Sequence, residues 1–196
     1  MLEAAFFARR PQVVARELIG CLLVSEIMGR RTSGIIVETE SYLAKQDSAC
    51  HGARGLTPKT EVMFGPAARA YVYPIHAKYC FNVVTESPGR PSAVLIRALE
   101  PVDGIDVMRR RRSMEDETTL VRGPARLCQA LGIDRRHNGL NLTLGKTLWI
   151  EPRPRTNETP GRIRKTIRIG VTSAHDLRLR CVLAGSRFAS GPRKLR

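Results

Sequence analysis

The stretch SGIIVETESYLAKQDSACHG, residues 33–52, joins a β-branched apolar run to a cluster of polar side chains that includes three carboxylates. Such a run is typical of a strand, and we expect residues 33–43 to form one. Successive side chains of a strand point to opposite faces. Glu38 and Glu40 are therefore predicted to share one face, and Val37 and Thr39 are predicted to share the opposite face. Both acids should therefore face the same surroundings.

These acids stand out because the chain as a whole is strongly basic. Its 33 Lys and Arg against 18 Asp and Glu give a formal net charge of +15 and a pI near 10.6. Such an excess produces a positive potential whose usual partner is nucleic acid or an anionic membrane surface. The alternative is a basic surface that only keeps the protein soluble, but phosphate neutralisation by Lys and Arg favours nucleic acid. Since acids repel a polyanion, the carboxylates should have a role other than attracting nucleic acid.

Length and hydropathy patterning favour one globular domain over residues 1–196. A hydrophobic content of 42% with scattered Pro and Gly argues against long disorder. No apolar run approaches the roughly 18 residues of a membrane span, and the N-terminus lacks the architecture of a signal peptide. We expect a soluble intracellular protein with no membrane partner.

The cysteines favour neither a disulfide framework nor a zinc ribbon. They are five in number, widely spaced and without a CxxC pair. We expect most of them to be small buried apolar side chains in a reducing compartment.

Periodicity and turn residues outline the remaining elements. A helix is expected from residue 11 to a stop at Gly20, then a strand over 21–28 and a turn at 29–32. A hairpin is expected over 70–86 with its tip near 74–78, followed by a strand over 92–101. One helix is expected to start at 101–103 and end in four arginines, and another to start at residues 123 and 124. Strands are expected within 140–152 and at 167–172, and a Pro-rich loop over 151–162.

Two interpretations of the acids follow from chemistry alone. Glu40 can act as a general base that activates water, or it can be an exposed strand carboxylate paired with one of the many cations. Glu38 and Asp47 are assigned structural or solvated roles, and His51 could be a base, a ligand or a loop residue. Together these four side chains could instead hold a hard divalent cation, as in nucleases.

The aromatic side chains gather in the expected hairpin, at Tyr71, Tyr73, Tyr79 and Phe81. Aromatic rings can stack on bases, and a hairpin tip can enter a groove as a wedge. The alternative is a packed β-core, which must hold for some of the four because alternate residues face opposite ways. The arginine run at 109–112 is either a phosphate-contacting helix end or a solvated one.

Taken together, these residues resemble the alkyladenine (3-methyladenine) DNA glycosylase family. The resemblance runs over nearly the whole chain, through AAFFARRPQVVARELIGCLLV, IVETESYL, AYVYPIHAKYCFNVV, VLIRALEP, GPARLCQALGI and IRIGVT. No single segment is specific to the family, but the order of the segments and the separations between them are.

The resemblance implies a role for each matching residue. The family's catalytic acid lies in a V-E-T-E-x-Y segment, which makes Glu40 the general base for the attacking water, and Arg97 of LIRALEP helps to position water and nucleotide. The carbonyl of Ile169 is a further water contact. In the family the flipped base stacks among three aromatic rings, which match Tyr42, His51 and Tyr73. An asparagine, matched by Asn82, limits the entry of bases with a guanine-type amino group.

The chain departs from the family pattern at the hairpin tip. The family's groove wedge is usually a tyrosine, whereas this sequence has His76. The segment HAKYCFN is also one residue shorter than in relatives, which blurs the alignment up to Asn82. The chain begins directly with the domain, which indicates a bacterial member.

The implied fold is α+β (mixed α/β), a single domain with a curved, mostly antiparallel sheet, surrounding helices and a protruding hairpin, like the barrel of formyltransferase C-terminal domains. The implied function is base-excision repair: a monofunctional glycosylase acting on double-stranded DNA with damaged purines, such as 3-methyladenine and hypoxanthine. We expect a monomer with no cofactor and no metal, located in the cytoplasm at the bacterial nucleoid, or in the nucleus if the source is eukaryotic.

Three other functions compete with this one. A bifunctional glycosylase-lyase needs an amine nucleophile, for which no lysine lies in a recognisable motif. A catalytically silent DNA-binding protein would need only the positive charge and a hairpin wedge. A metal-dependent nuclease comes third.

Overall fold

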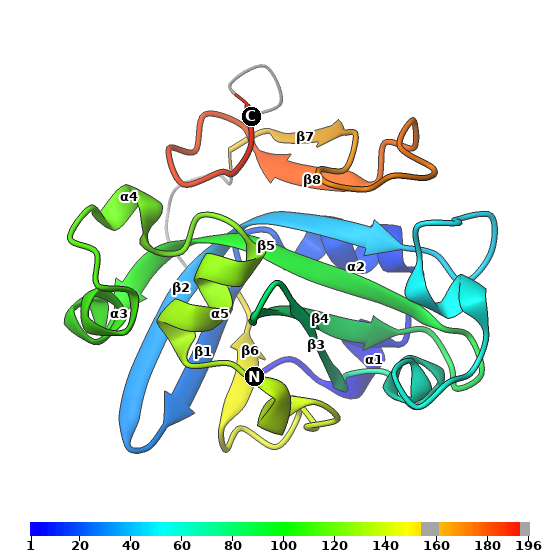
Figure 1. Cartoon of the computed structure of the whole chain (residues 1–196), viewed down its shortest axis with the longest axis horizontal. Coiled ribbons are helices and arrows are strands. Elements are labelled where there is room, and N and C mark those ends of the chain that lie inside the picture. Colours follow the sequence, from blue (N-terminus) through cyan, green and yellow to red (C-terminus); the bar gives the residue numbers. More distant parts are fainter. Residues whose placement is uncertain (154–160, 193–196) are drawn as a thin grey trace.

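The computed structural model describes residues 1–153 and 161–192. Over these residues eight strands form one sheet in the order β3-β4-β5-β2-β1-β6, and β8 pairs with β2 while β7 pairs with β8 (Figure 1). Every one of these strand pairings is antiparallel. The strands are β1 (Leu22–Ile27), β2 (Arg30–Tyr42), β3 (Ala70–Ile75), β4 (Lys78–Thr85), β5 (Ser92–Asp103), β6 (Leu148–Glu151), β7 (Ile163–Thr166) and β8 (Arg180–Leu183).

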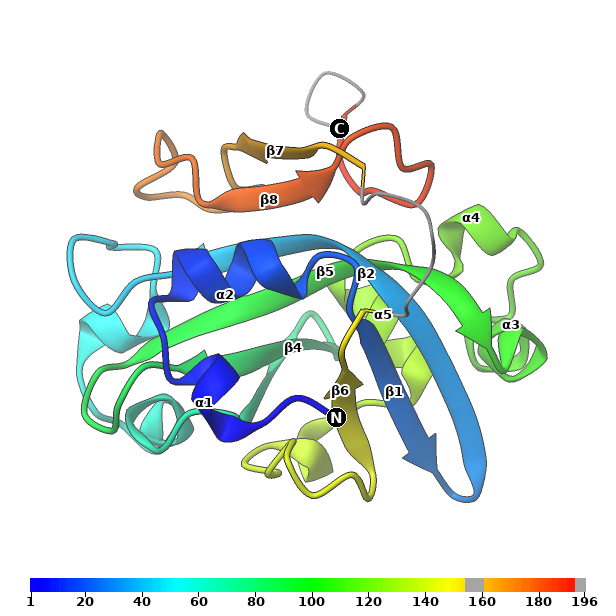
Figure 2. The same ribbon diagram turned by 180° about the vertical axis from the view of Figure 1, so that it is seen from behind.

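The helices are short and pack around this curled sheet (Figures 1 and 2). They are α1 (Ala4–Phe7), α2 (Pro11–Leu18), α3 (Ile105–Arg112), α4 (Glu117–Leu120) and α5 (Pro124–Leu131), with 3₁₀ turns at His51–Arg54, Glu61–Phe64 and Arg135–His137. The expected single α+β domain with an antiparallel sheet is confirmed.

The long central strands β2 and β5 pair with each other and carry the sheet's curvature. Their register shifts between Ile36 and Thr39, which marks a bulge in β2. The bulge interrupts the expected alternation, because Val37 packs against Phe188 of the C-terminal segment while the hydroxyl of Thr39 donates to the carbonyl of Ala15 in α2. Val37 and Thr39 therefore do not share surroundings, although Glu38 and Glu40 do, as described below.

The main core lies between the sheet and the apolar sides of α2 and α5. Helix α2 begins with Pro11, whose fixed φ suits a first helical turn, and it buries Val14 and Leu18 completely. Helix α5 ends at Gly132, which adopts a left-handed φ of 74°. Complete burial of a side chain such as Leu18 contributes about 1.5–3 kcal/mol. The positions expected for both helices are confirmed.

Two expected boundaries are wrong. Strand β5 continues through Asp103, so the following helix begins at Ile105 rather than at 101–103. The reason is Gly104, whose left-handed φ of 70° provides the sharp change from strand to helix. The first hairpin turns at Met28 and Gly29, both with positive φ, so residues 30–32 already belong to β2 and not to the turn.

The expected late strands are only partly correct. Within 140–152 the strand is confined to Leu148–Glu151. Residues 167–172 form no strand; the strands here are the neighbouring β7 and β8. In this segment Arg168 is buried against Asp47 and the main-chain N–H of Ile169 donates to Glu40, whereas Ile167 and Gly170 are exposed. Most of the Pro-rich loop expected at 151–162 lies outside the described residues.

The aromatic hairpin forms as expected from β3 and β4. Ile75 pairs with Lys78, which leaves a two-residue tip at His76 and Ala77 with φ values of 44° and 59°. Two positive φ values in a two-residue loop define a type I′ turn, whose twist suits a hairpin. Non-glycine residues rarely adopt this conformation, and each such residue costs on the order of 1–2 kcal/mol.

Three side chains of the arginine run at 109–112 make contacts within the protein, whereas Arg110 is exposed, as the solvated alternative has it. Arg111 donates to the carbonyl of Ala130, Arg112 to the carbonyl of Leu120, and Arg109 to Asp106. Carbonyls at helix ends lack intrahelical partners, and cations satisfy them well. Arg111 and Arg112 therefore join α3 to the C-terminal ends of α5 and α4, and contact of the run with phosphate stays a prediction.

All five cysteines are free and buried, as expected. Over the described ranges, no helix is long and apolar enough to cross a membrane.

Candidate active site

The carboxylate of Glu40 is completely buried on β2 and has three donors. The main-chain N–H of Ile169 donates to Oε1 at 2.8 Å. The hydroxyl of Tyr42 donates to Oε2 at 3.0 Å, and Nη1 of Arg97 donates to the same oxygen at 3.2 Å. Glu40 is therefore held in one orientation by groups from three separate parts of the chain, and the single donor to Oε1 leaves one of its lone pairs unused.

A second buried acid, Glu38, holds Arg97 from the other side. Nε of Arg97 donates to Oε1 of Glu38 at 2.8 Å, and Nε of Arg180 donates to the same atom at 2.7 Å. Ser190 adds its N–H to Oε2 at 2.6 Å and its hydroxyl to Oε1 at 2.9 Å. Burial would raise the pKa of Glu38, but the two arginines and these hydrogen bonds lower it below the ordinary value. Glu38 is thus a structural acid, and the alternative of a solvated acid is wrong.

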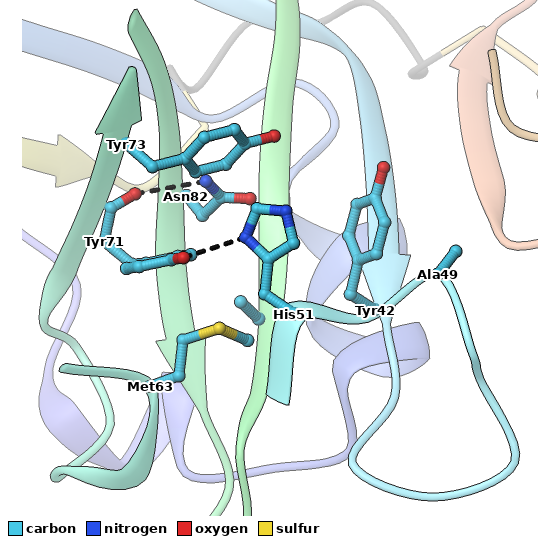
Figure 3. Close-up of a pocket in the computed structure, with 8 residues that line it drawn as sticks. Tyr42, Ala49, His51, Met63, Tyr71, Tyr73 and Asn82 are labelled. Atoms are coloured by element: carbon cyan, nitrogen blue, oxygen red, sulfur yellow. Dashed lines mark hydrogen bonds between the residues drawn. The ribbon is translucent and has the colours of Figure 1, made fainter. Parts of the chain in front are cut away.

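An aromatic pocket is lined in part by Tyr42 (Figure 3), the residue whose hydroxyl donates to Glu40. Its lining residues come from β2, β3, β4, β5 and the connection after β2: Tyr42, Ala49, His51, Met63, Tyr71, Tyr73, Asn82 and Ala93. The space between them is about 20 Å³, on a scale where one water needs roughly 10–15 Å³. The pocket is therefore narrow, and a planar molecule would enter by parting the rings.

Three of the expected ring residues meet in this pocket. The ring of His51 lies edge-on to Tyr73, with centroids 4.6 Å apart and an interplanar angle of 68°. Figure 3 shows Tyr42 across the gap from His51. The rings are thus arranged with His51 and Tyr73 together and Tyr42 opposite.

The protonation of these rings follows from their burial. Burial and, to a lesser degree, Arg54 lower the pKa of His51 below its usual value, because both disfavour the imidazolium. Nδ1 of His51 lies 2.8 Å from the hydroxyl of Tyr71. Burial, followed by the charge of Glu40, raises the pKa of Tyr42, so its hydroxyl stays protonated and donates to that carboxylate.

Asn82 lies at the inner side of the same pocket, opposite Tyr71 in the β3–β4 pair. Its amide donates to the carbonyl of Tyr71 at 3.1 Å, and its side chain is almost completely buried. The pairing gives Asn82 an unambiguous place in the pocket despite the shortened hairpin.

The side chains that could have formed a metal site do not gather into one cluster; they are Glu38, Glu40, Asp47 and His51. Among the described residues, no three His, Cys, Asp or Glu side chains form a group that could hold a metal ion. Glu38 and Asp47 are instead engaged by buried arginines.

The sequence profile of the methylpurine-DNA glycosylase family matches residues 5–187. The chain belongs to this family. The protein is therefore a DNA glycosylase, a hydrolase that acts on DNA.

Curated relatives agree with this family assignment over most of their length. The chain is 47% identical over 195 residues to a protein of Rhodopirellula baltica, covering 97% of this chain and 83% of the relative. It is 46% identical to a protein of Carboxydothermus hydrogenoformans and 47% identical to one of Methanoculleus marisnigri, covering 97% and 96% of this chain and 98% of each relative. All three relatives carry a provisional assignment as 3-methyladenine DNA glycosylases. The relatives of this chain include bacterial proteins, and the expectation that this chain is itself bacterial stays a prediction.

The expected wedge residue of the glycosylase lies apart from its pocket. His76 is exposed at the tip of the β3–β4 hairpin and does not line the pocket. The structure therefore unites Glu40, Arg97, Tyr42, His51, Tyr73 and Asn82 in one region and leaves His76 at the hairpin tip.

Sequence reasoning missed the partners that fix this site. Arg168 and Arg180 are both almost completely buried, and each forms an ion pair with an acid more than a hundred residues away. The available signal was local: Arg168 lies between two isoleucines in IRIGVT. Asp47, expected to be structural or solvated, is buried in an ion pair with Arg168.

Proposed function

We propose that the protein is a monofunctional glycosylase that removes alkylated or deaminated purines, such as 3-methyladenine and hypoxanthine, from double-stranded DNA. It hydrolyses the N-glycosidic bond with a water activated by Glu40 and leaves an abasic site. The observation that carries the proposal is the hydroxyl of Tyr42, which lines the aromatic pocket and donates to Glu40 at 3.0 Å. One residue thus joins the surface suited to a base and the acid suited to water.

The target base must leave the duplex before it can reach Glu40. Turning a nucleotide out costs a few kcal/mol of stacking and pairing, and least for a damaged base. We assign the hairpin tip with His76 to the groove, where it fills the space left by the nucleotide. The net charge of +15 supports binding to the phosphates.

Glu40 then acts on a water on the face opposite the departing base. The water oxygen forms a bond to C1′ of the sugar as the C1′–N bond breaks, and the base takes the electron pair of that bond. The water proton passes to Glu40, whose Oε1 has the remaining acceptor capacity. Nη1 of Arg97 lies 3.4 Å from the carbonyl of Ile169, which supports a role for both in water positioning.

The pocket discriminates bases by charge and shape. An electron-poor, cationic alkylated purine is attracted to aromatic faces, and it leaves readily because its charge is neutralised as the bond breaks. Neutral hypoxanthine depends more on protonation of, or hydrogen bonds to, the leaving base. Asn82 is assigned to exclude bases with a guanine-type amino group. We further infer a monomer that works in the cytoplasm at the nucleoid.

Incubation with a hypoxanthine-containing duplex tests the reaction type. Free base should be released in the presence of EDTA, and strands should break only after alkali or heat. A covalent adduct trapped by borohydride would show a lyase, and the pocket lining contains no lysine that could form one. Inhibition by EDTA would indicate the nuclease-like metal site, and tight binding without base release would indicate a catalytically silent DNA-binding protein.

A further inference from the structure

Directly behind the pocket lies a buried ion pair that takes no direct part in the proposed chemical step. Nη2 of Arg168 donates to Oδ1 of Asp47 and Nη1 donates to Oδ2, both at 2.7 Å. Both side chains are completely excluded from solvent. A bidentate pair of this kind fixes the plane of the guanidinium as well as its position.

The guanidinium of Arg168 also lies over the ring of Tyr42, with its carbon 4.7 Å from the ring centroid. Arg168 does not line the pocket, although Tyr42 does. The arginine therefore covers the face of the ring that is turned away from the pocket, and a base would stack on the other face. Tyr42 is thus placed between a permanent cation and the space for the base.

The ion pair is held rigidly at this distance. Asp47 also accepts the N–H groups of Leu43 and Ala49, and Arg168 donates to the carbonyls of Ser41 and Ala174. Because the donors and acceptors come from the segments on both sides of Tyr42 and from the loop after β7, neither charge can move away from the ring.

A charge in this position acts on a base through the ring. Stacked aromatic groups have centroids about 4.5–7 Å apart, so a base on Tyr42 lies on the order of 9–12 Å from the guanidinium. The cation of Arg168 opposes binding of a cationic base, and the carboxylate of Asp47 compensates for most of that effect. A neutral base is much less sensitive to either charge.

We propose that the Asp47–Arg168 ion pair determines how strongly this glycosylase prefers cationic over neutral purines, through the balance of charge behind Tyr42. This inference rests on the proposed function. It assigns both residues a positioning and selectivity role, without contact with the substrate.

Three variants test the charge balance: Asp47→Asn, Arg168→Met and Arg168→Lys. Single-turnover excision is measured with enzyme in excess over DNA but below saturation, so that binding of the base contributes to the rate. The duplexes contain cationic 3-methyladenine or neutral hypoxanthine, and the ratio of the two rates is compared with wild type. Asp47→Asn leaves an uncompensated cation, so the ratio should fall roughly two- to fifteenfold. Arg168→Met removes the cation next to the ring, so the ratio should rise about twofold or more. Arg168→Lys keeps the charge, so the ratio should stay within about twofold of wild type while both rates fall.

The pair Arg9–Glu17 provides matched controls. Nη2 of Arg9 lies 2.7 Å from Glu17, and its guanidinium lies 4.6 Å from the ring of Phe6, but none of these residues lines the pocket. Glu17→Gln and Arg9→Met therefore make the same charge changes beside another ring, and both should leave the ratio unchanged.

Opposite shifts from the two partners would support the inference, because a merely structural pair would lower both rates in parallel. Each charge-changing variant is decisive alone, so either suffices if the other does not fold. If wild type excises both bases but the folded variants keep its ratio, or shift it in the same direction, the inference is wrong and the proposed function stands. If wild type excises neither base, the proposed function itself fails.

Discussion

The main-chain N–H of Ile169 donates to Oε1 of Glu40 at 2.8 Å, across 129 positions of sequence. Glu40 is fixed by its strand, whereas Ile169 lies in a loop that follows β7 and is held by the ion pair of its neighbour Arg168 with Asp47. The orientation of the proposed general base thus depends on a loop that local sequence would not associate with it.

Replacing Glu40 with Gln should remove catalysis while preserving the shape of the site. The amide keeps the size of the side chain but cannot take a proton from water, so single-turnover excision of hypoxanthine should fall by roughly 10²–10⁴. Binding to lesion DNA, measured by fluorescence anisotropy, should survive. Near wild-type excision by the folded variant would remove Glu40 from the mechanism.

Replacing Glu38 with Gln should act mainly on stability. The change leaves Arg97 and Arg180 without their buried counter-charge, and loss of one partner of such a group costs about 3–5 kcal/mol. Urea denaturation at pH 7 measures the loss. Glu26→Gln, on the exposed side of β1, is the matched control and should change the free energy of unfolding by less than about 0.5 kcal/mol. An equal effect of both variants would contradict the prediction.

The stabilisation by Glu38 should also depend on pH. Its pKa is lower in the folded protein than in the unfolded chain, so the stabilisation is fully present above the unfolded value, about 4.3, and is lost as pH falls through the folded value. The difference in unfolding free energy between wild type and Glu38→Gln should therefore shrink below about pH 4. A difference that stays constant from pH 7 to pH 3 would show that the charge of Glu38 is not its source.

His51 should make excision of cationic purines sensitive to acid. Burial lowers its pKa, so the imidazole is neutral at pH 7 and becomes charged only below its ordinary titration range near 6.5. The imidazolium then repels a cationic base but not a neutral one. The rate ratio of 3-methyladenine to hypoxanthine, measured in single turnover below saturation from pH 8 to pH 5, should fall in acid for wild type and not for His51→Gln. Identical pH profiles for the two proteins would remove His51 from this role.

Replacing His76 with Ala should weaken lesion binding without slowing the chemical step. Loss of base–aromatic stacking costs on the order of 1–3 kcal/mol. Fluorescence of 2-aminopurine beside the lesion reports unstacking and should show less flipping in the variant. His175→Ala, at another exposed histidine, is the control and should behave like wild type. If both variants flip and bind equally well, another residue of the tip enters the groove.

Much of the fold follows from local sequence. The strand over 33–43, the aromatic hairpin and the helices marked by Pro11 and Pro124 are where periodicity and turn residues place them. The predicted helix start at 101–103 and the predicted strand at 167–172 are wrong for a similar reason. At both places the conformation depends on a neighbouring glycine or a buried partner rather than on the residues' own propensities.

The sequence by itself determined the family and, through it, the antiparallel sheet, because motifs and their spacing can be read along the chain. It also predicted Glu40 and the ring residues as the site. Only the tertiary structure decided which acids are fixed and by what. Asp47 meets Arg168 across 121 positions, and Glu38 meets Arg180 across 142. Local sequence distinguishes neither acid from a solvated carboxylate. Whether an acid is buried, and which cation it pairs with, depends on how distant segments pack against each other. A buried charge is stable only where this packing brings its counter-charge within hydrogen-bond distance.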